Sequence, residues 1–391
     1  MVKTGLEIIR NKLPRQLKGK KTGVLCHAPS VASNFCHITD ILSEMKDIHL
    51  SAIFGPQHGM FGQTQDNMIE WEGHKDDRLH VPVFSLYGKN RKPDRDMLKN
   101  IEAFVIDLQD VGARLYTYVW TTKLCIEACS EMGIPIWILD RPNPIGRLPY
   151  DGPVLKKEYF TFVGGASIPM CHRMTIGEMA LWIKERYYNN ADLNIVWMKD
   201  WHRDSLFTET GLPWVLPSPN MPSIDTSMVY PGTVLSEALN ISEGRGTTIP
   251  FELTGAPFIN AYRLKDFLDK RKISGCVFRV HGFIPTFNKY NGEYCNGIQI
   301  HVTDPDNYYP VATALEIFNA VIKTTPERSL KFRLPPYEYE TRLMPFDILS
   351  GDDGMRKILE SGNSLSSEKE RWKYEIEDFI KEFREISAYS E

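Results

Sequence analysis

Short runs of Val, Ile and Leu recur along the first half of the chain and alternate with stretches of helical pattern. These runs lack polar alternation, which is typical of strands buried on both faces of a parallel sheet. We therefore predict an α/β fold whose first domain, residues 1–210, is a Rossmann-like, doubly wound parallel sheet. The predicted strands are residues 22–27, 50–54, 103–108, 134–139 and 193–198.

Helix signals lie between these strands. Residues 121–132 carry apolar side chains at helical spacing and are followed by Gly133, a common helix stop. Residues 175–188 begin with Thr175 and place Glu178 three positions later, which is the pattern of a capping box. Residues 94–99 predict one further, short helix.

The pattern changes near residue 211. The segment GLPWVLPSPNMP, residues 211–222, holds four prolines and has no helical or strand period, so we expect an ordered crossing between domains. Residues 211–391 are predicted to form a smaller α+β C-terminal domain, with the active cleft between the two domains. Its predicted strands are residues 277–280 and 298–302, and its predicted helices are residues 261–270, 311–323, 353–361 and 368–387.

Composition and charge narrow the class of protein. The 391 residues are 42% hydrophobic and 25% charged, as in a globular protein long enough for two domains. The 46 Lys and Arg fall below the 50 Asp and Glu, which argues against a nucleic-acid partner because phosphate neutralisation needs a basic excess. No apolar run of about 18 residues occurs, so we expect no membrane span. Charged residues interrupt the apolar positions of the N-terminus, which argues against a secretory signal.

The sequence offers little for a metal or cofactor. The seven cysteines are scattered without CxxC spacing, and we expect reduced thiols in a cytoplasmic protein. The first predicted strand runs into CHAPSVASN, which lacks the glycine-rich turn that a dinucleotide needs, and no GxxxxGK[ST] loop is present. His172 and His301 have no metal-ligand spacing. We predict no cofactor and no metal site, and the oligomeric state stays open.

Polar loops follow three of the predicted strands, at residues 54–73, 107–117 and 140–146. Ligands bind outside the carboxyl ends of parallel strands, so we expect these loops to meet on one rim. Glycoside hydrolysis needs a protonated acid for the leaving oxygen and stabilisation of a cationic sugar carbon, usually from two carboxyl groups. The candidate catalytic carboxyls are Asp66, Glu70, Asp107 and Asp110, with Asp140 and Glu243 also open as the opposing group.

Three of these carboxyls also have structural alternatives. Asp107 ends a strand and is suited to capping the next turn. Asp110 is suited to be the N-cap of a helix beginning at Val111. Asp140 stands beside Arg141, so the two are suited to form an ion pair that fixes the proline turn.

A glycine-flanked arginine marks the second domain. The segment NISEGRGTTIPF, residues 240–251, places Arg245 between two glycines, which let the backbone approach a ligand while the arginine reaches an anion. We expect the three polar turns to face Arg245 across one groove. The predicted substrate-binding residues are Gln57, His58, Arg114, Tyr116, Asp140, Arg141, Asn143, Asn220, Glu243, Arg245 and Thr247.

With these motifs in place, the sequence resembles the bacterial exo-acting β-N-acetylmuramidases, the NamZ-like glycoside hydrolases. The resemblance implies a Rossmann-like domain, a C-terminal domain and an active cleft between them. It also implies release of N-acetylmuramic acid from the non-reducing ends of peptidoglycan fragments in cell-wall recycling. The motifs are PQHGMFG, VPVFSLYGKNRKP, DLQDVGARLYTY, LDRPNPIG, MTIGEMA, GLPWVLPSPNMP, YPGTVLSEALNISEGRGT and NGIQIHVTD.

Gln57 departs from the family pattern. Many members carry Pro-Glu-His-Gly where this chain has Pro-Gln-His-Gly at residues 56–59, and that glutamate is their proposed catalytic acid. A glutamine has no ionisable proton and cannot act as a general acid. Another carboxyl, Asp66, Glu70 or Asp107, then takes that role, or the chain binds muramyl sugars without hydrolysing them. A glycosidase for another acidic or amino sugar is the third alternative.

For a hydrolase, the expected partner is a small-molecule sugar or a muropeptide. Arg245 and Arg114 are expected to hold the lactyl carboxylate by charge-assisted hydrogen bonds. Asn220 or His58 is expected to hold the N-acetyl group, which also remains open as the nucleophile of a substrate-assisted reaction.

Overall fold

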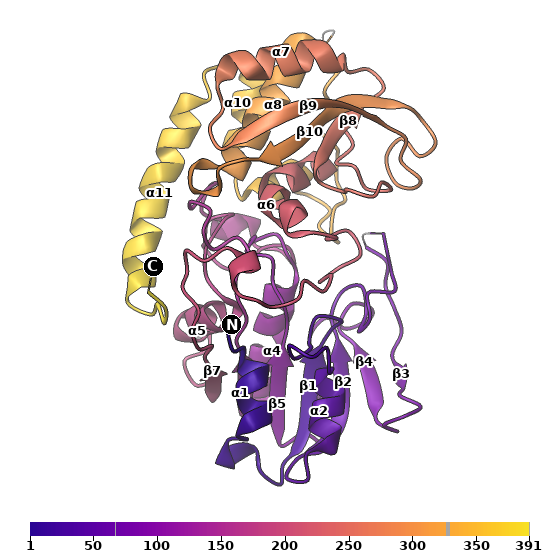
Figure 1. Ribbon diagram of the computed structural model, residues 1–391, viewed down its shortest axis with the longest axis vertical. Helices are drawn as coiled ribbons and strands as arrows, with labels where there is room; N and C mark the ends of the chain where they lie inside the picture. The colour runs from indigo at the N-terminus through magenta and orange to yellow at the C-terminus, as the bar shows by residue number, and fades with distance from the viewer. Residues whose placement is uncertain (67, 326–328, 391) are drawn as a thin grey trace.

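The computed structural model describes residues 1–66, 68–325 and 329–390 and places two domains end to end, with the N-terminal domain lower in Figure 1. In this part of the chain the first domain is built on a seven-stranded sheet of order β3-β4-β2-β1-β5-β6-β7. All pairings are parallel except that of β3 with β4. The strands are β1 Lys21–Cys26, β2 His49–Gly55, β3 His74–Lys75, β4 Pro82–Ser85, β5 Ala103–Asp107, β6 Ile136–Leu139 and β7 Leu193–Val196.

The five strands predicted from apolar runs are all present in this sheet, and the α/β class is confirmed. The strands β3 and β4 were not predicted. β3 is the edge strand and β4 lies next to it, and both are too short for a long continuous apolar run. The two residues of β3 are both exposed, so their pattern carries no sign of a strand.

The order of the strands locates a ligand crevice. From β1 the sheet extends through β2 and β4 on one side and through β5, β6 and β7 on the other. The direction of winding therefore reverses between β1 and β5. In open α/β sheets this switch point, at the carboxyl ends of the strands, is where ligands bind.

Helices cover both faces of the sheet (Figure 1). The predicted capping box of α5 is present, because the hydroxyl of Thr175 accepts from the N–H of Glu178 while the Glu178 carboxylate accepts from the N–H of Thr175. The helix α4 begins at Tyr118, so the helix considered at Val111 does not form. The helices of this domain are α1 Gly5–Asn11, α2 Ile38–Glu44, α3 Arg95–Leu98, α4 Tyr118–Met132 and α5 Ile176–Tyr187, with 3₁₀ turns η1 Arg15–Leu17, η2 Lys157–Tyr159 and η3 Phe207–Glu209.

The second domain is a smaller α+β unit, as predicted. Its antiparallel sheet has the order β8-β10-β9, with α6 and α7 packed against it and α8 packed against these two helices. Residues 211–222 form neither helix nor strand and connect the two domains. The elements are α6 Ile224–Thr233, η4 Val234–Ala238, β8 Leu253–Ala256, α7 Ala261–Arg271, β9 Cys276–Phe283, β10 Cys295–Val302, η5 Pro305–Asn307, α8 Pro310–Thr324, α9 Pro345–Ser350, α10 Gly354–Ser361 and α11 Ser366–Arg384.

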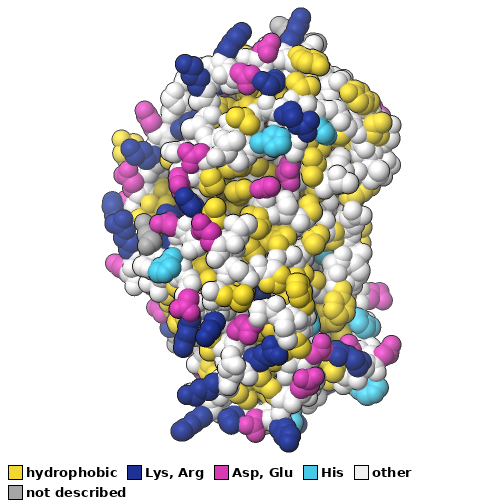
Figure 2. Space-filling model, viewed as in Figure 1, with side chains coloured by type: hydrophobic (Ala, Val, Ile, Leu, Met, Phe, Trp, Pro, Cys, Tyr) yellow, Lys and Arg dark blue, Asp and Glu magenta, His cyan; other side chains and the backbone are white. Residues whose placement is uncertain are grey.

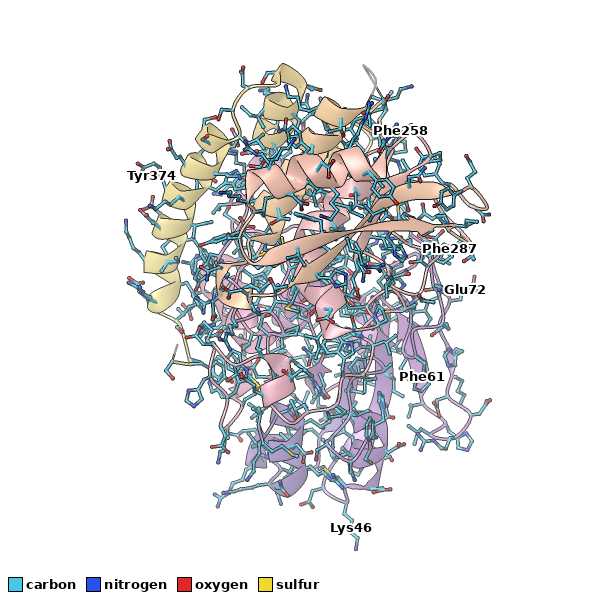
Figure 3. The ribbon with its side chains drawn as sticks, turned by 45° about the horizontal axis from the view of Figure 1, so that its top comes forward. Lys46, Phe61, Glu72, Phe258, Phe287 and Tyr374 are labelled. Atoms are coloured by element: carbon cyan, nitrogen blue, oxygen red, sulfur yellow. The ribbon has the colours of Figure 1, made fainter. Side chains whose placement is uncertain are left out.

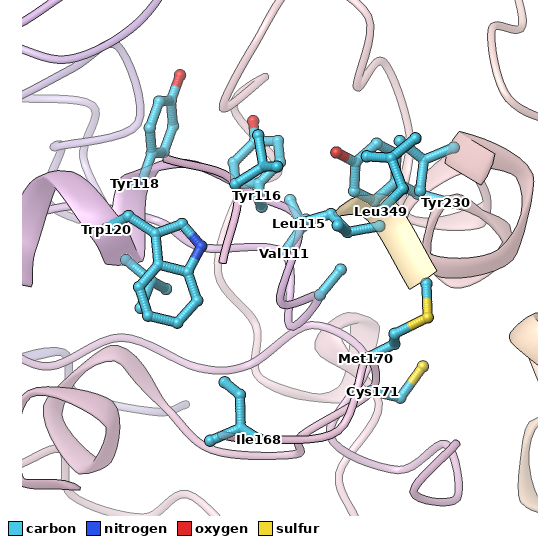
Figure 4. Packing of buried hydrophobic residues seen from close by; sticks show 14 of the residues in the cluster. Val111, Leu115, Tyr116, Tyr118, Trp120, Ile168, Met170, Cys171, Tyr230 and Leu349 are labelled. Atoms are coloured by element: carbon cyan, nitrogen blue, oxygen red, sulfur yellow. The ribbon is translucent and has the colours of Figure 1, made fainter. Parts of the chain in front are cut away.

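The two domains share one hydrophobic core. Figure 4 shows Tyr230 of α6 and Leu349 of α9 beside Leu115 and Tyr116, which follow β5 in the first domain. All four side chains are buried. Figure 2 shows apolar side chains concentrated around the middle of the visible face, with charged groups toward its ends. Across the described residues, every helix is too short or too polar to cross a bilayer.

The last helix returns the chain to the first domain. In Figure 1 α11, coloured yellow, runs down the side of the molecule from the second domain toward the first. The hydroxyl of Tyr389 donates to Asp140, and Nη2 of Arg203 donates to the hydroxyl of Ser387 at 2.8 Å. Arg203 also forms two hydrogen bonds, of 2.6 and 2.9 Å, with the carboxylate of Glu178. This ion pair is almost completely buried.

We predict that Glu178→Gln destabilises the protein by about 3–5 kcal/mol, because the substitution removes one charge of a buried ion pair. Denaturant unfolding followed by circular dichroism measures the change. The control is Glu382→Gln, which removes an exposed pair with Arg186 and is expected to cost less than about 1 kcal/mol. Equal losses of unfolding free energy for the two variants would contradict the larger contribution expected from the buried ion pair.

Candidate active site

A small cavity of about 40 Å³ lies between the two domains. The first domain contributes the loop after β2 and the loop that leads from β5 into α4, and the crossing segment between the domains also contributes. The second domain contributes η4, the glycine-flanked segment and residues 337–349. The polar and aromatic lining residues are Gln57, His58, Tyr116, Thr117, Tyr118, Ser218, Asn220, Tyr230, Glu237, Arg245, Phe251, Tyr337 and Glu338.

A larger groove of about 540 Å³ shares Glu237 with this cavity. Its volume falls within the range of about 300–1,000 Å³ that is usual for small-molecule sites, whereas the cavity is of a size for water. Asn288 donates to Asp66 Oδ1 at 3.1 Å at the edge of the groove, so the two domains meet there. Figure 3 shows Phe287 on the same side of the molecule as Phe61 and Glu72. The polar groove residues are Asp66, Glu237, Asn240, Glu243, Asn288, Lys289, Tyr290, Lys331 and Arg333.

Gln57 lies directly after β2 and is buried, with 4% of its surface exposed. Its side-chain Oε1 accepts from the hydroxyl of Thr117 at 2.7 Å. The hydroxyl of Tyr118 lies 3.4 Å from the main-chain carbonyl oxygen of Gln57 and donates to the carbonyl of Pro217 at 2.6 Å. The loops after β2 and β5 and the crossing segment are thus joined at the cavity.

Three tyrosines form the apolar wall. The ring of Tyr116 meets Tyr118 edge to face at 4.8 Å between centroids, and meets Tyr230 edge to face at 5.8 Å. Because Tyr230 comes from α6, this contact crosses the domain boundary. Edge-to-face pairs at these separations are favourable beyond the area they bury.

Arg245 is held between two carboxylates. Its Nη2 donates to Glu237 Oε1 at 2.6 Å, and its Nε lies 3.4 Å from Glu243 Oε1. The flanking Gly246 has φ 80°, and a Cβ there would lie 2.7 Å from the main-chain nitrogen of Thr286. Glycine is therefore required at this position for the segment to pack closely.

Glu237 and Glu338 have contrasting environments in the same cavity. Burial opposes ionisation of Glu237, but the charge and hydrogen bond of Arg245 outweigh it and lower the pKa of this carboxyl. Burial, with the nearby charge of Glu237, raises the pKa of Glu338 to about 7, against the opposing effect of Arg91. Two carboxyls whose pKa values are pushed apart are the usual basis for separate acid and base roles.

His58 is neutral in this site, because burial lowers its pKa to about 4. Its Nδ1 lies 2.7 Å from the carbonyl oxygen of Thr64. A carbonyl only accepts, so Nδ1 carries the proton and Nε2 is left as an acceptor. The residue has φ 69°, in the left-handed region, which fixes the turn that places the ring at the cavity.

Asp110 is buried behind the wall formed by Tyr116, Tyr118 and Tyr230 and does not line the cavity. Its Oδ2 accepts from the N–H of Gly112 at 2.7 Å, while Oδ1 has no hydrogen-bond partner among the described residues. Burial raises its pKa to about 7. His172 Nε2 lies 3.9 Å away, but burial lowers the pKa of this histidine to about 3, so it carries no charge to pair with Asp110.

Arg114 does not reach the cavity. Its guanidinium is fully buried and donates to the carbonyls of four residues at 2.7–3.0 Å. These donors hold main chain rather than a substrate carboxylate. The four carbonyls belong to Pro153, Ile168, Leu349 and Ser350.

Asp107 and Arg141 form an ion pair with each other. Both are buried, and Arg141 binds both carboxylate oxygens of Asp107, with Nη2 to Oδ2 at 2.8 Å. The ion pair considered between Asp140 and Arg141 is therefore wrong. Asp140 accepts instead from the N–H of Gly177 at 2.8 Å and from the hydroxyl of Thr175 at 3.1 Å.

Other predicted residues also bond within the fold. Asn143 bridges Met174 and Ile145 through its side chain, at 2.9 Å each, and Thr247 donates to the carbonyl of Gly244 at 2.6 Å. Glu70 is exposed and accepts from the hydroxyl of Tyr339 at 2.8 Å. The loops after β2 and β5 thus reach the cavity, whereas the loop after β6 does not.

The structure brings together seven predicted residues in the cavity and groove and adds others that were missed. Glu237 was missed although it lies within a quoted motif, YPGTVLSEALNISEGRGT, eight positions before Arg245. Glu338 lies in PPYEYE, which carries no recognisable pattern. The predicted residues in place are Gln57, His58, Tyr116, Asn220 and Arg245 in the cavity and Asp66 in the groove, where Glu243 also lies.

The molecule is a two-domain α/β protein whose candidate site, with its buried carboxyl groups, lies between the domains. The N-terminal family model of exo-beta-N-acetylmuramidase NamZ matches residues 22–225, and its C-terminal family model matches residues 228–389. The chain belongs to this family, and the predicted resemblance is confirmed.

Known relatives extend over nearly the whole chain. A peptidoglycan beta-N-acetylmuramidase NamZ of Bacillus subtilis is 41% identical over 388 residues, which cover 99% of this chain and 91% of that relative. Two crystal structures of DUF1343 family proteins from Bacteroides fragilis each cover 100% of this chain and 99% of their own. They have TM-scores of 0.87 and 0.79 at 29% and 28% identity.

We predict that Arg114→Lys lowers the free energy of unfolding by about 3 kcal/mol, because a single ammonium cannot reach all four carbonyls and each orphaned buried group costs about 1–3 kcal/mol. Denaturant unfolding measures this. The folded variant is expected to bind free N-acetylmuramic acid with unchanged affinity in calorimetry. Weaker sugar binding at unchanged stability would contradict this structural role and indicate that Arg114 binds the substrate.

Proposed function

We propose that this protein is an exo-acting glycoside hydrolase that releases terminal β-linked N-acetylmuramic acid from peptidoglycan fragments. The observation that carries the proposal is the interdomain cavity, where two buried glutamates of opposite protonation tendency stand beside Gln57 and His58. Membership of the exo-β-N-acetylmuramidase family supports the sugar and the exo mode.

The sugar ring is proposed to occupy the groove, with its anomeric carbon and the glycosidic oxygen directed toward the cavity at Glu237. The groove has the volume for a sugar, and Glu237 belongs to both spaces. The neutral His58 presents an acceptor nitrogen, which suits the N–H of an N-acetyl group. Asn220 lines the cavity from the crossing segment, where it donates to the carbonyl of Gln65 at 2.7 Å.

The lactyl carboxylate is proposed to lie over the basic side of the groove. Arg245 is balanced by Glu237 and Glu243, so its main effect is to orient Glu237. Lys331 and Arg333 line the groove and are exposed, where they can meet a carboxylate of the substrate.

The cytoplasmic location stays a prediction. All seven cysteines are free thiols, and Cys36 is the one that is more than slightly exposed. Buried reduced thiols are compatible with a reducing compartment. A recycling enzyme in that compartment would act on imported muropeptides or their sugars.

We predict that the purified protein hydrolyses a chromogenic β-N-acetylmuramic acid glycoside and a disaccharide that ends in N-acetylmuramic acid. Released sugar is measured by absorbance and by mass spectrometry. The matched control is the β-N-acetylglucosamine glycoside, which lacks the lactyl group and is expected to react far more slowly.

Micromolar binding of N-acetylmuramic acid without turnover would contradict the hydrolase and favour the binding-protein alternative. In that case Gln57→Glu would be expected to gain activity. Faster turnover of another acidic sugar glycoside would favour the third alternative.

We predict that the double variant Lys331→Met and Arg333→Met raises the inhibition constant of free N-acetylmuramic acid about fivefold, since two exposed charge pairs contribute about 0.5 kcal/mol each. The inhibition constant of N-acetylglucosamine, which has no carboxylate, is expected to stay unchanged. The control variant is Lys270→Met on α7, away from the groove. Equal changes for the two sugars would contradict carboxylate recognition at this place.

A further inference from the structure

Residues 337–340 form a tight hairpin turn with an unusual backbone. Tyr337 and Glu340 exchange two main-chain hydrogen bonds of 2.9 Å. The two central residues, Glu338 and Tyr339, have φ values of 44° and 69°. Two consecutive left-handed residues define a turn that normally takes Asn-Gly, because other side chains are strained there. Strain of this kind is kept where the surrounding structure requires it.

The surroundings hold the turn from the first domain. The hydroxyl of Tyr87, which follows β4, donates to Glu338 Oε2 at 3.3 Å. The Arg91 guanidinium lies 3.7 Å from the ring centroid of Tyr339, and the hydroxyl of Tyr339 donates to Glu70 at 2.8 Å. The turn is thus fixed against loops that follow β2 and β4.

The effect of this turn is to place a carboxyl inside the cavity. Glu338 is 5% exposed and lines the cavity together with Gln57, Glu237 and Arg245. Its neighbour Tyr337 donates to Glu237 Oε2 at 2.7 Å, so the same turn also fixes the second carboxyl. Glu237 has Arg245 as counter-ion, while the described residues provide no cation within ion-pair distance of Glu338.

We propose that Glu338 is the general acid of the glycosidase reaction and supplies the proton that Gln57 cannot. This assignment rests on the proposed function. The Glu338 carboxyl transfers its proton to the glycosidic oxygen as the bond from that oxygen to the sugar carbon breaks, and the bonding electron pair stays on the oxygen. Water then adds to the sugar carbon and releases one proton, which restores Glu338. The ionised Glu237 stabilises the positive charge that develops on the sugar carbon.

The other candidate carboxyls are less well placed. Asp110 has a similar pKa, of about 7, but lies behind the wall of the cavity. Asp66 lies in the groove and accepts from Asn288. Asp107 has both oxygens bound by Arg141. Among the carboxyls of the described residues, Glu338 combines access to the cavity with retention of a proton near neutral pH.

The test compares leaving groups. An alcohol leaving group needs protonation, whereas a 2,4-dinitrophenolate leaves without it. Glu338→Gln is therefore expected to lower kcat/KM on the disaccharide by about 10²–10⁴, the usual contribution of general acid catalysis. On the 2,4-dinitrophenyl glycoside the loss is expected to be much smaller. The control is Glu340→Gln, in the same turn but outside the cavity, which is expected to retain both activities.

The pH profile gives a second readout. The acid must be protonated, so kcat/KM on the disaccharide is expected to fall as the pH rises through about 7. In Glu338→Gln this alkaline fall is expected to disappear. Glu338→Gly relieves the strained φ and is expected to melt at a higher temperature than the wild type while losing the disaccharide activity, which separates loss of chemistry from loss of folding.

Three results would overturn the assignment. Glu338→Gln with wild-type activity on the disaccharide would do so, as would equal losses on both substrates, which indicate a structural or binding role. Both results leave the proposed function intact, because the wild type still turns over. If the wild type hydrolyses neither substrate, the result would instead contradict the proposed function, and the assignment of Glu338 as the acid would be wrong as well.

Discussion

The buried guanidinium of Arg114 ties the two domains together through their main chains. It donates to two carbonyls of the first domain and two of the second, at 2.7–3.0 Å. Gly351, with φ 100°, leaves it room, since a Cβ there would lie 2.8 Å from Nη2. Burial of a cation without a carboxylate is costly, and burial lowers the pKa of Arg114 to about 9. The next residues along the chain, Leu115 to Tyr118, line the cavity, so this join lies beside the site.

Closure of the two domains sets the chemistry of the cavity. Glu237 and Glu338 both come from the second domain, and Gln57 and Tyr118 of the first domain cover them. Burial disfavours the charged form of each carboxyl to begin with. Arg245 reverses this effect for Glu237 alone. The pKa values of the two groups therefore differ because of the charges and hydrogen bonds around them and not because of their depth.

The amide at position 57 fits this charge balance. Arg245 and Lys289 are two cations, and they meet two carboxylates, Glu237 and Glu243. A third carboxylate at the end of β2 would add a negative charge without a partner in a buried space, which is costly. Gln57 instead accepts a neutral hydrogen bond from Thr117. Under the proposal for Glu338, the position where the resemblance predicts the acid holds an uncharged amide, and Glu338 in its strained turn supplies the proton.

The sequence by itself determined the class of fold, the strands β1, β2, β5, β6 and β7, the capping box of α5 and the family, because these depend on local periodicity and on short ordered motifs. It also identified Gln57, His58 and Arg245, which stand in such motifs. Only the tertiary structure decided which charged residues face the cavity. Asp107 is bound by Arg141, 34 positions away, and Arg114 holds carbonyls more than 230 positions away. Glu338 reaches the cavity through a turn whose residues are atypical for its geometry. Such pairings are settled by burial between domains, a long-range effect that no local pattern records.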